Sequence, residues 1–170
     1  MSMFTASVPR LNQMLANLDS WLSQAAAYAE ERGFDPEILV QARLYPDQFA
    51  LVRQVQSACD TAKFIAARLG GHEAPVHPDD ETKLAELHAR IASTRAFLDE
   101  VSESDFAGAK DRRISLPGLP GKVMTGPEYL NGFALPNFYF HATTAYAILR
   151  HNGVPLGKRT FIGHLDLKDG

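Results

Sequence analysis

The sequence predicts an all-α protein, a four-helix bundle of antiparallel type with a short hairpin-like insertion before its last helix. The first observation behind this prediction is that four long segments carry apolar residues at helical spacing. The second is that one stretch ahead of the last segment carries hairpin signals, while no further sheet is indicated. The length of 170 residues suits one domain. We assign that domain to residues 1–170, with residues 154–170 as an extended tail.

The first predicted helix covers residues 8–32, where polar and apolar side chains separate onto two sides. Ser7 is the expected N-cap, with Pro9 in the first turn, and Gly33 is the expected stop. Trp21 flanks the apolar stripe, which consists of Val8, Leu11, Leu15, Leu18, Leu22, Ala25 and Ala29.

The second helix is expected to begin near Pro46-Asp47 and to end at Gly70-Gly71. Residues 34–45, which precede it, are too many for a tight turn and should form a short helix across the end of the bundle. The apolar stripe of the second helix consists of Leu51, Val55, Ala58, Cys59, Ala62, Ile65, Ala66 and Leu69.

The third helix follows a loop over residues 70–78, and Asp79 or Asp80 is its expected cap. Acidic residues at its start, Asp80 and Glu81, suit the positive end of the helix dipole. The side chains expected to point inward are Leu84, Leu87, Ile91, Leu98 and Val101.

The hairpin-like insertion is predicted from two short runs, residues 112–116 and 122–125, on either side of a Pro/Gly cluster. Residues 127–135 are expected to form one or two helical turns. Pro136 then either begins the last helix or kinks it, because proline supplies no backbone N–H.

The last helix, residues 136–153, is apolar almost all the way round and ends at Gly153. A helix of this kind is covered on most of its faces inside a bundle or an oligomer. We therefore predict that protein surrounds it on nearly every side. In the polar tail that follows, Phe161-Ile162 is expected to fold back on the body of the protein.

One polar seam interrupts this apolar helix and makes His141 the leading candidate site residue. Asn137 and His141 lie one turn apart, so their side chains point to the same place. Thr144 and His151 continue the seam beside Ile148.

The seam allows two interpretations. Two donors four residues apart on one helix suit a zinc or nickel ion, which needs at least one more ligand from a facing helix. The first position is Asn137, whose amide oxygen is a poor ligand, so a metal here would need further donors, such as Asp60 or His151 brought in by the fold or by a second subunit. Alternatively, Asn137 and His141 hydrogen-bond a buried polar group. Gln54 or Gln56 on the second helix could face His141 as a recognition residue.

Other reactive side chains carry less functional weight. Cys59 lies in an apolar stripe, where a thiol is usually inert packing. Asp60 points nearly opposite that stripe and is expected to be solvated or interfacial. The remaining histidines are interpreted as solvated surface residues: His72, His77, His88 and His164.

Composition excludes several classes of protein. A net charge of −3 lacks the basic excess of a nucleic-acid binder. No run approaches the ~20 apolar residues that span a bilayer, and the first seven residues lack the regions of a signal peptide. One cysteine excludes an internal disulfide framework. We therefore expect a cytoplasmic protein with neither nucleic acid nor membrane as a partner.

Three segments resemble a family of bacterial proteins of unknown function that is grouped with the DinB/YfiT-like bundles. They are residues 42–49, residues 53–60 and residues 136–159. The most specific part is Arg150-His151-Asn152-Gly153-Val154-Pro155-Leu156-Gly157-Lys158-Arg159, and the resemblance covers nearly the whole chain.

The resemblance implies a four-helix bundle of the DinB/YfiT-like type, often a homodimer, related to metalloenzymes and thiol-dependent transferases. In the wider group, one histidine on helix two and a His-x-x-x-His pair on helix four hold a divalent metal. The second histidine of the pair matches His141 and the first matches Asn137, while the helix-two position falls near Gln56 or Ser57. Only one of three ligands is kept, so the resemblance implies a degenerate metal site.

Three functional hypotheses follow from the residues and the resemblance. The leading one is a bundle that lacks the complete metal site and binds a small ligand, or only a partner subunit, near His141. The second is a divalent-metal-dependent transferase that acts on a low-molecular-weight thiol. The third is a non-enzymatic dimeric scaffold or stress-related protein, with Tyr139, Phe140 and Tyr146 in the interface.

Overall fold

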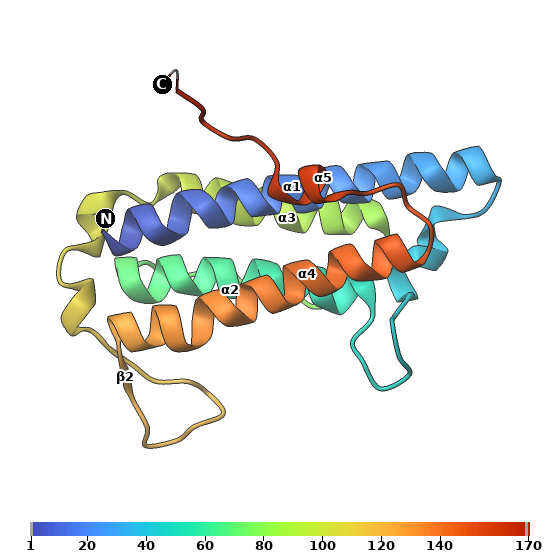
Figure 1. Cartoon of the computed structure of the whole chain (residues 1–170). Helices are drawn as coiled ribbons and strands as arrows, with labels where there is room; N and C mark the ends of the chain where they lie inside the picture. The colour runs from blue at the N-terminus through green and yellow to red at the C-terminus, as the bar shows by residue number, and fades with distance from the viewer. Residues whose placement is uncertain (1, 169) are drawn as a thin grey trace.

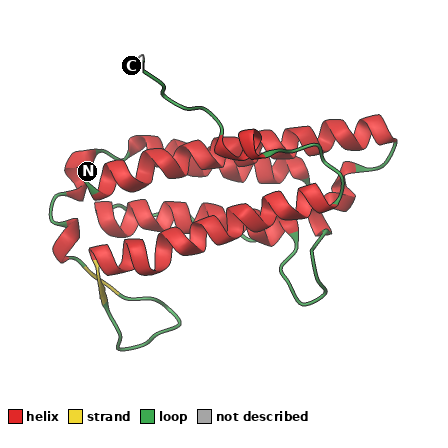
Figure 2. Cartoon of the chain, in the orientation of Figure 1, coloured by secondary structure: helices red, strands yellow, loops and turns green. Residues whose placement is uncertain are grey.

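The computed structural model describes residues 2–168 and residue 170 of the chain. Four long helices lie side by side and form the body of the protein (Figure 1). Helix accounts for nearly all of its regular structure (Figure 2), which confirms the predicted all-α bundle. The four helices are α1 (Met3–Arg32), α2 (Leu51–Gly70), α3 (Leu84–Glu100) and α4 (Leu135–His151).

Helices α2 and α3 are parallel neighbours, which corrects the expectation of a purely antiparallel bundle. The backbone N–H of Leu84, at the start of α3, donates to Glu37 near the start of α2, at 2.8 Å. At the other end, a Cβ on Gly70 would lie 3.4 Å from Val101 just after α3. The connection over residues 71–83 therefore runs the length of the bundle, as a parallel arrangement requires.

Helix α1 begins five residues earlier than the sequence predicted. Ser2 is its N-cap and forms a capping box with Thr5, which satisfies backbone donors of the first turn. The expected cap, Ser7, is instead buried inside the helix, and its hydroxyl donates to the Met3 carbonyl at 2.6 Å. Pro9 consequently lies in the interior of α1, while the predicted stop at Gly33 is confirmed.

The short helix predicted over residues 34–45 is present as the 3-10 helix η1 (Pro36–Gln41). Helix α2 begins later than predicted, after the cap residue Ala50. Residues 45–48 form a turn instead, in which the Gln48 N–H donates to the Tyr45 carbonyl at 3.0 Å. The proline at position 46 therefore precedes the helix by several residues.

Helix α3 is capped by neither Asp79 nor Asp80. Its N-cap is Lys83, and the Glu86 carboxylate accepts from the backbone N–H of Lys83 at 3.0 Å. The carboxylate of Asp79 instead forms an ion pair with Arg90, at 2.9 Å, which is a tertiary contact.

The predicted hairpin is present as two short antiparallel strands, β1 (Arg113–Ile114) and β2 (Met124–Thr125). Two 3-10 helices, η2 (Glu103–Phe106) and η3 (Ala109–Asp111), connect α3 to it. Next comes η4 (Glu128–Ala134), a π-helix that continues directly into α4. The N–H of Leu135 bonds to the Leu130 carbonyl, five residues back, and Pro136 lies in the first turn of α4, which begins at Leu135.

The tail folds back on the body, as predicted, through a short helix α5 (Lys158–Ile162). The Phe161 ring stacks on Trp21 of α1 with ring centroids 5.4 Å apart. The Trp21 indole N–H donates to the Thr160 carbonyl at 3.1 Å, and the Asn17 amide donates to the Phe161 carbonyl at 2.9 Å. Trp21 is itself fully buried, so this contact belongs to the core.

Within one copy of the chain, helix α4 is not covered on every side. Phe140 is 59% exposed and Tyr139 is 37% exposed, so one flank of the helix faces outward. The sequence did not distinguish this flank from the buried one, which carries Phe138 and Ala142, because both flanks consist of apolar residues. The homodimer contact expected along this flank stays a prediction. Among the described residues, no helix is long and apolar enough to cross a membrane.

Candidate functional site

A cavity of about 520 Å³ lies between α2, the η4–α4 segment and the loop of the β1–β2 hairpin. Its lining includes Asn137 and His141, the two residues that the sequence placed one turn apart on α4. Its full lining is Ser57, Asp60, Thr61, Phe64, Arg68, Leu116, Pro117, Gly118, Leu119, Tyr129, Phe133, Asn137 and His141. Pockets with apolar walls and a few polar groups are typical of small-molecule sites.

His141 is held in a defined orientation by Gln54. The Gln54 amide NH₂ donates to the Phe49 carbonyl at 3.1 Å, which turns its amide oxygen toward the imidazole. His141 Nδ1 lies 2.8 Å from that oxygen and must therefore carry the proton. The Nε2 atom has no partner among the described residues, and His141 lines both this cavity and a smaller pocket of about 220 Å³ that Gln54 also lines.

The imidazole of His141 is neutral at pH 7. Burial lowers its pKa below the ordinary 6.5, and the positive charge of Arg53 lowers it further. Only 8% of the residue is exposed. A neutral ring with a protonated Nδ1 presents Nε2 as a hydrogen-bond acceptor or base.

Asn137 is also oriented by a chain of hydrogen bonds. The Thr61 hydroxyl donates to the Ser57 carbonyl at 2.7 Å, so its oxygen accepts from the Asn137 NH₂ group at 2.8 Å. The amide oxygen of Asn137 has no partner among the described residues. Asn137 Oδ1 and His141 Nε2 are therefore two acceptors, one helical turn apart, that line the same cavity.

The sequence indicated that Asp60 is solvated or interfacial, and its side chain is partly exposed, at 27%, but ion-paired. One oxygen, Oδ1, accepts from Lys63 at 2.8 Å and from Arg90 at 2.7 Å. Both cations are buried, so they offset the charge of the carboxylate at close range. Asp60 thus lines the cavity as part of a paired ion cluster.

Arg68 provides the cation at the other side of the cavity. Its guanidinium lies 4.7 Å from the centroid of the Phe64 ring and 5.5 Å from that of Tyr129. One Nη atom donates to the Tyr129 hydroxyl at 3.2 Å. No carboxylate lies within ion-pair distance of Arg68 among the residues that the structure describes.

The donor set around His141 does not fit a divalent metal. In the described part of the chain, no three His, Cys, Asp or Glu side chains gather around a common centre. The nearby carboxylate, Asp60, is already paired with Lys63 and Arg90, and two cations beside it oppose a third. His141, Asn137 and Asp60 provide too few good ligands for nickel or zinc, and the nearby cations disfavour a further positive charge.

The other residues predicted for this site lie elsewhere. Gln56 is buried but donates to Glu81 at 2.7 Å, away from His141. Thr144 bonds back to the Phe140 carbonyl of its own helix at 2.7 Å. His151 is exposed at the end of α4, so the seam predicted along the helix ends at His141.

Three histidines interpreted as solvated surface residues have acidic or basic partners: His72 is exposed, as interpreted, whereas His77 and His88 are only partly exposed. His88 lies 2.6 Å from Asp19, and His72 lies 3.2 Å from Asp105. His77 lies between Lys63 at 3.2 Å and the Ser93 hydroxyl at 3.0 Å. A lysine can only donate, so the His77 proton is on Nε2, and that ring cannot activate Ser93 as a base.

Cys59 is inert packing, as the sequence predicted. The thiol is fully buried, and burial raises its pKa to about 12. A protonated thiol in the core has neither the charge nor the access that a nucleophile needs.

Sequence reasoning missed the residues that complete the cavity. Phe64 and Arg68 come one and two turns after Thr61 on α2, but their ligand-facing role depends on what lies opposite. Tyr129 and Phe133 come from the π-helix, and Leu119 comes from the hairpin loop. The one available signal was a pair of aromatic residues, Tyr129 and Phe133, within residues 127–135. The α-helical period does not predict which way the side chains of this segment point.

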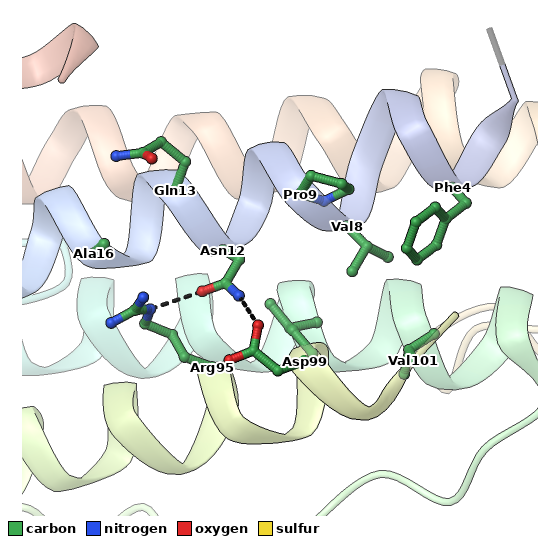
Figure 3. Close-up of a pocket in the computed structure, with 10 residues that line it drawn as sticks. Phe4, Val8, Pro9, Asn12, Gln13, Ala16, Arg95, Asp99 and Val101 are labelled. Carbon is green, nitrogen blue, oxygen red and sulfur yellow. Dashed lines mark hydrogen bonds between the residues drawn. The ribbon is translucent and has the colours of Figure 1, made fainter. Parts of the chain in front are cut away.

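A second pocket of about 380 Å³ lies between the first half of α1 and the end of α3. Figure 3 shows the Asn12 side chain between Arg95 and Asp99. Arg95 donates to Asn12 at 2.7 Å, and Asn12 donates in turn to Asp99. The Asn12 amide is satisfied on both sides, the cation Arg95 shares the lining with the carboxylate of Asp99, and the lining has no imidazole acceptor like that of His141.

Comparison with known proteins agrees with this fold. The sequence profile of DUF1993, a domain of unknown function, matches residues 3–162. A crystal structure of a DinB family member protein from Shewanella denitrificans is similar, with 48% sequence identity and a TM-score of 0.94. The match covers 98% of this chain and 95% of that chain. No curated protein matches the sequence significantly.

Proposed function

The chain belongs to the DUF1993 family, and from that premise we propose that it binds a small organic ligand in the cavity beside His141. The observation that carries the proposal is the fixed state of that ring. Gln54 holds the Nδ1 proton at 2.8 Å, so Nε2 is a free acceptor beside a cavity of about 520 Å³. A volume of this size suits a ligand of 10 to 20 non-hydrogen atoms, roughly.

The polar groups of the cavity support binding over packing. Neither acceptor, His141 Nε2 or Asn137 Oδ1, counts among the buried unpartnered atoms of the described residues, so a ligand donor would replace a hydrogen bond to water and gain about 0.5–1.5 kcal/mol net. Asn137 Oδ1 offers a second acceptor one turn away. The aromatic rings of Phe64, Tyr129 and Phe133 provide apolar walls for the ligand body.

The proposal is tested by screening a library of small organic fragments against isotope-labelled protein by NMR. We expect fragments with a hydrogen-bond donor to shift the His141 ring signals and the backbone signals of Thr61 and Asn137. The variant His141→Phe keeps an aromatic ring but has no acceptor. It should bind these fragments about tenfold more weakly than wild type does. Signals of the Arg95 pocket serve as the internal control.

Two outcomes would contradict the proposal. The first is a screen in which no fragment shifts the His141 ring at millimolar concentration. The second is a set of fragments that bind there equally well to wild type and to His141→Phe, because Nε2 would then play no part.

A further inference from the structure

The charges of the cavity indicate what kind of ligand it accepts, and this inference rests on the proposed function. Asp60 lines the cavity but is paired with Lys63 and Arg90, at 2.8 and 2.7 Å. Arg68 lines it too and has no carboxylate partner among the described residues. The unpaired charge that the lining offers is therefore positive.

The environment of Arg68 favours a planar anion. The guanidinium lies over Phe64 and Tyr129, which limits water on its faces. Among the described residues, only one Nη has a partner, the Tyr129 hydroxyl at 3.2 Å, so the remaining N–H groups of the fork are free to donate. A carboxylate matches such a fork with two parallel hydrogen bonds.

The opposite side of the cavity requires donors from the ligand. His141 Nε2 and Asn137 Oδ1 can only accept in the orientations that Gln54 and Thr61 impose. Arg68 follows Thr61 by seven residues, about 10 Å along α2. Its side chain leans back toward the start of the helix, so it reaches the cavity that Asn137 and His141 also line.

We infer that the ligand is an organic carboxylate with an apolar or aromatic body and a hydrogen-bond donor, such as a hydroxyl group, at its far end. The carboxylate pairs with Arg68. The donor binds His141 Nε2 or Asn137 Oδ1, and the body packs between Phe64 and Phe133.

Three matched probes test this ligand class. They are 3-(4-hydroxyphenyl)propanoate, its neutral primary amide, and 3-phenylpropanoate, which lacks the hydroxyl group. We expect the hydroxy acid to bind at least tenfold more tightly than the amide, because the amide loses the charge-assisted pair. We also expect it to bind severalfold more tightly than 3-phenylpropanoate. Dissociation constants come from NMR titration of the His141 and Asn137 signals.

Variants assign the preference to named residues. Arg68→Gln should remove the difference between acid and amide, because the acid loses its charged partner. Arg95→Gln, in the pocket of Figure 3, should keep that difference in full. Circular dichroism melts of both variants establish that each one is folded.

The inference is overturned if the amide binds wild type as tightly as the acid, or if Arg68→Gln keeps the preference for the acid. It is also overturned if none of the probes binds while other fragments shift His141. In each of these cases the proposed function still stands. A failure of every fragment at His141 would instead remove both.

Discussion

Replacing Trp21 with alanine is expected to lower the free energy of unfolding by about 4 kcal/mol. The indole is fully buried and packs against two aromatic rings, Phe161 at 5.4 Å and Tyr146 at 5.5 Å between centroids. The variant would lose this packing, and it would leave the Thr160 carbonyl without its donor. Urea unfolding followed by far-UV circular dichroism measures the change.

The same substitution should release the tail, because Trp21 is the main ring on which Phe161 stacks. Amide hydrogen exchange over residues 158–162 should become fast in Trp21→Ala, while α2 stays protected. Trp21→Phe retains a ring and should cost only about 1–2 kcal/mol. If Trp21→Ala lost less than about 1 kcal/mol, the tail would not be part of the core.

Replacing Arg90 with methionine is expected to cost about 3 kcal/mol. The Arg90 side chain is only 2% exposed and contacts three carboxylates, Asp60 at 2.7 Å, Asp79 at 2.9 Å and Glu81 at 2.8 Å. Burial alone would raise the pKa of Glu81, but hydrogen bonds from Arg90 and Gln56 hold it below its usual value. Without the cation, these carboxylates repel one another beside a low-dielectric core.

Arg95→Met is the matched control, because Arg95 lies on the same helix and bonds only to the neutral Asn12. We expect it to change the unfolding free energy by less than about 1 kcal/mol. Arg90→Met should also release the crossing segment that carries Asp79 and Glu81, seen as faster exchange over residues 76–82. Equal effects of the two substitutions would show that the ion cluster contributes no particular stability.

The bundle could be predicted from the sequence because helical periodicity is a local property. The stripes of α1 and α2 predicted their buried faces, and Gly33 and Gly71 marked their ends through a left-handed backbone that favours glycine. Helix starts were less predictable. Several polar residues could cap each helix, and the tertiary role of Asp79 was decided by Arg90, which is distant in the sequence.

The direction of α3 and the π-helix could not be read from periodicity. The thirteen residues between α2 and α3 could form a local turn or run back along the length of the bundle. The hydrogen bond between Leu84 and Glu37 shows that they run along the bundle. In η4 the hydrogen bonds span five residues, so a pattern of 3.6 assigns its faces wrongly.

The candidate site was predictable only on the α4 side. His141 and Asn137 were identified because polar residues interrupt an apolar helix, and Gln54 because it borders the facing stripe. Arg68 gave no comparable signal. An arginine near the end of a helix is ordinary on a surface, and its role depends on Tyr129 and on the hairpin loop, sixty and fifty residues away, roughly.

The protonation state of His141 is the property on which the proposed ligand site depends most directly. Its two ring nitrogens can be distinguished by long-range ¹H–¹⁵N NMR, and its pKa follows from a titration of the same signals. At pH 7.5 we expect a neutral ring with the proton on Nδ1, and a pKa below 6.5. A ligand that binds in the cavity should then shift Nε2 more than Nδ1. A proton on Nε2 at that pH, or a pKa above 7, would contradict the assignment of this atom as the free acceptor.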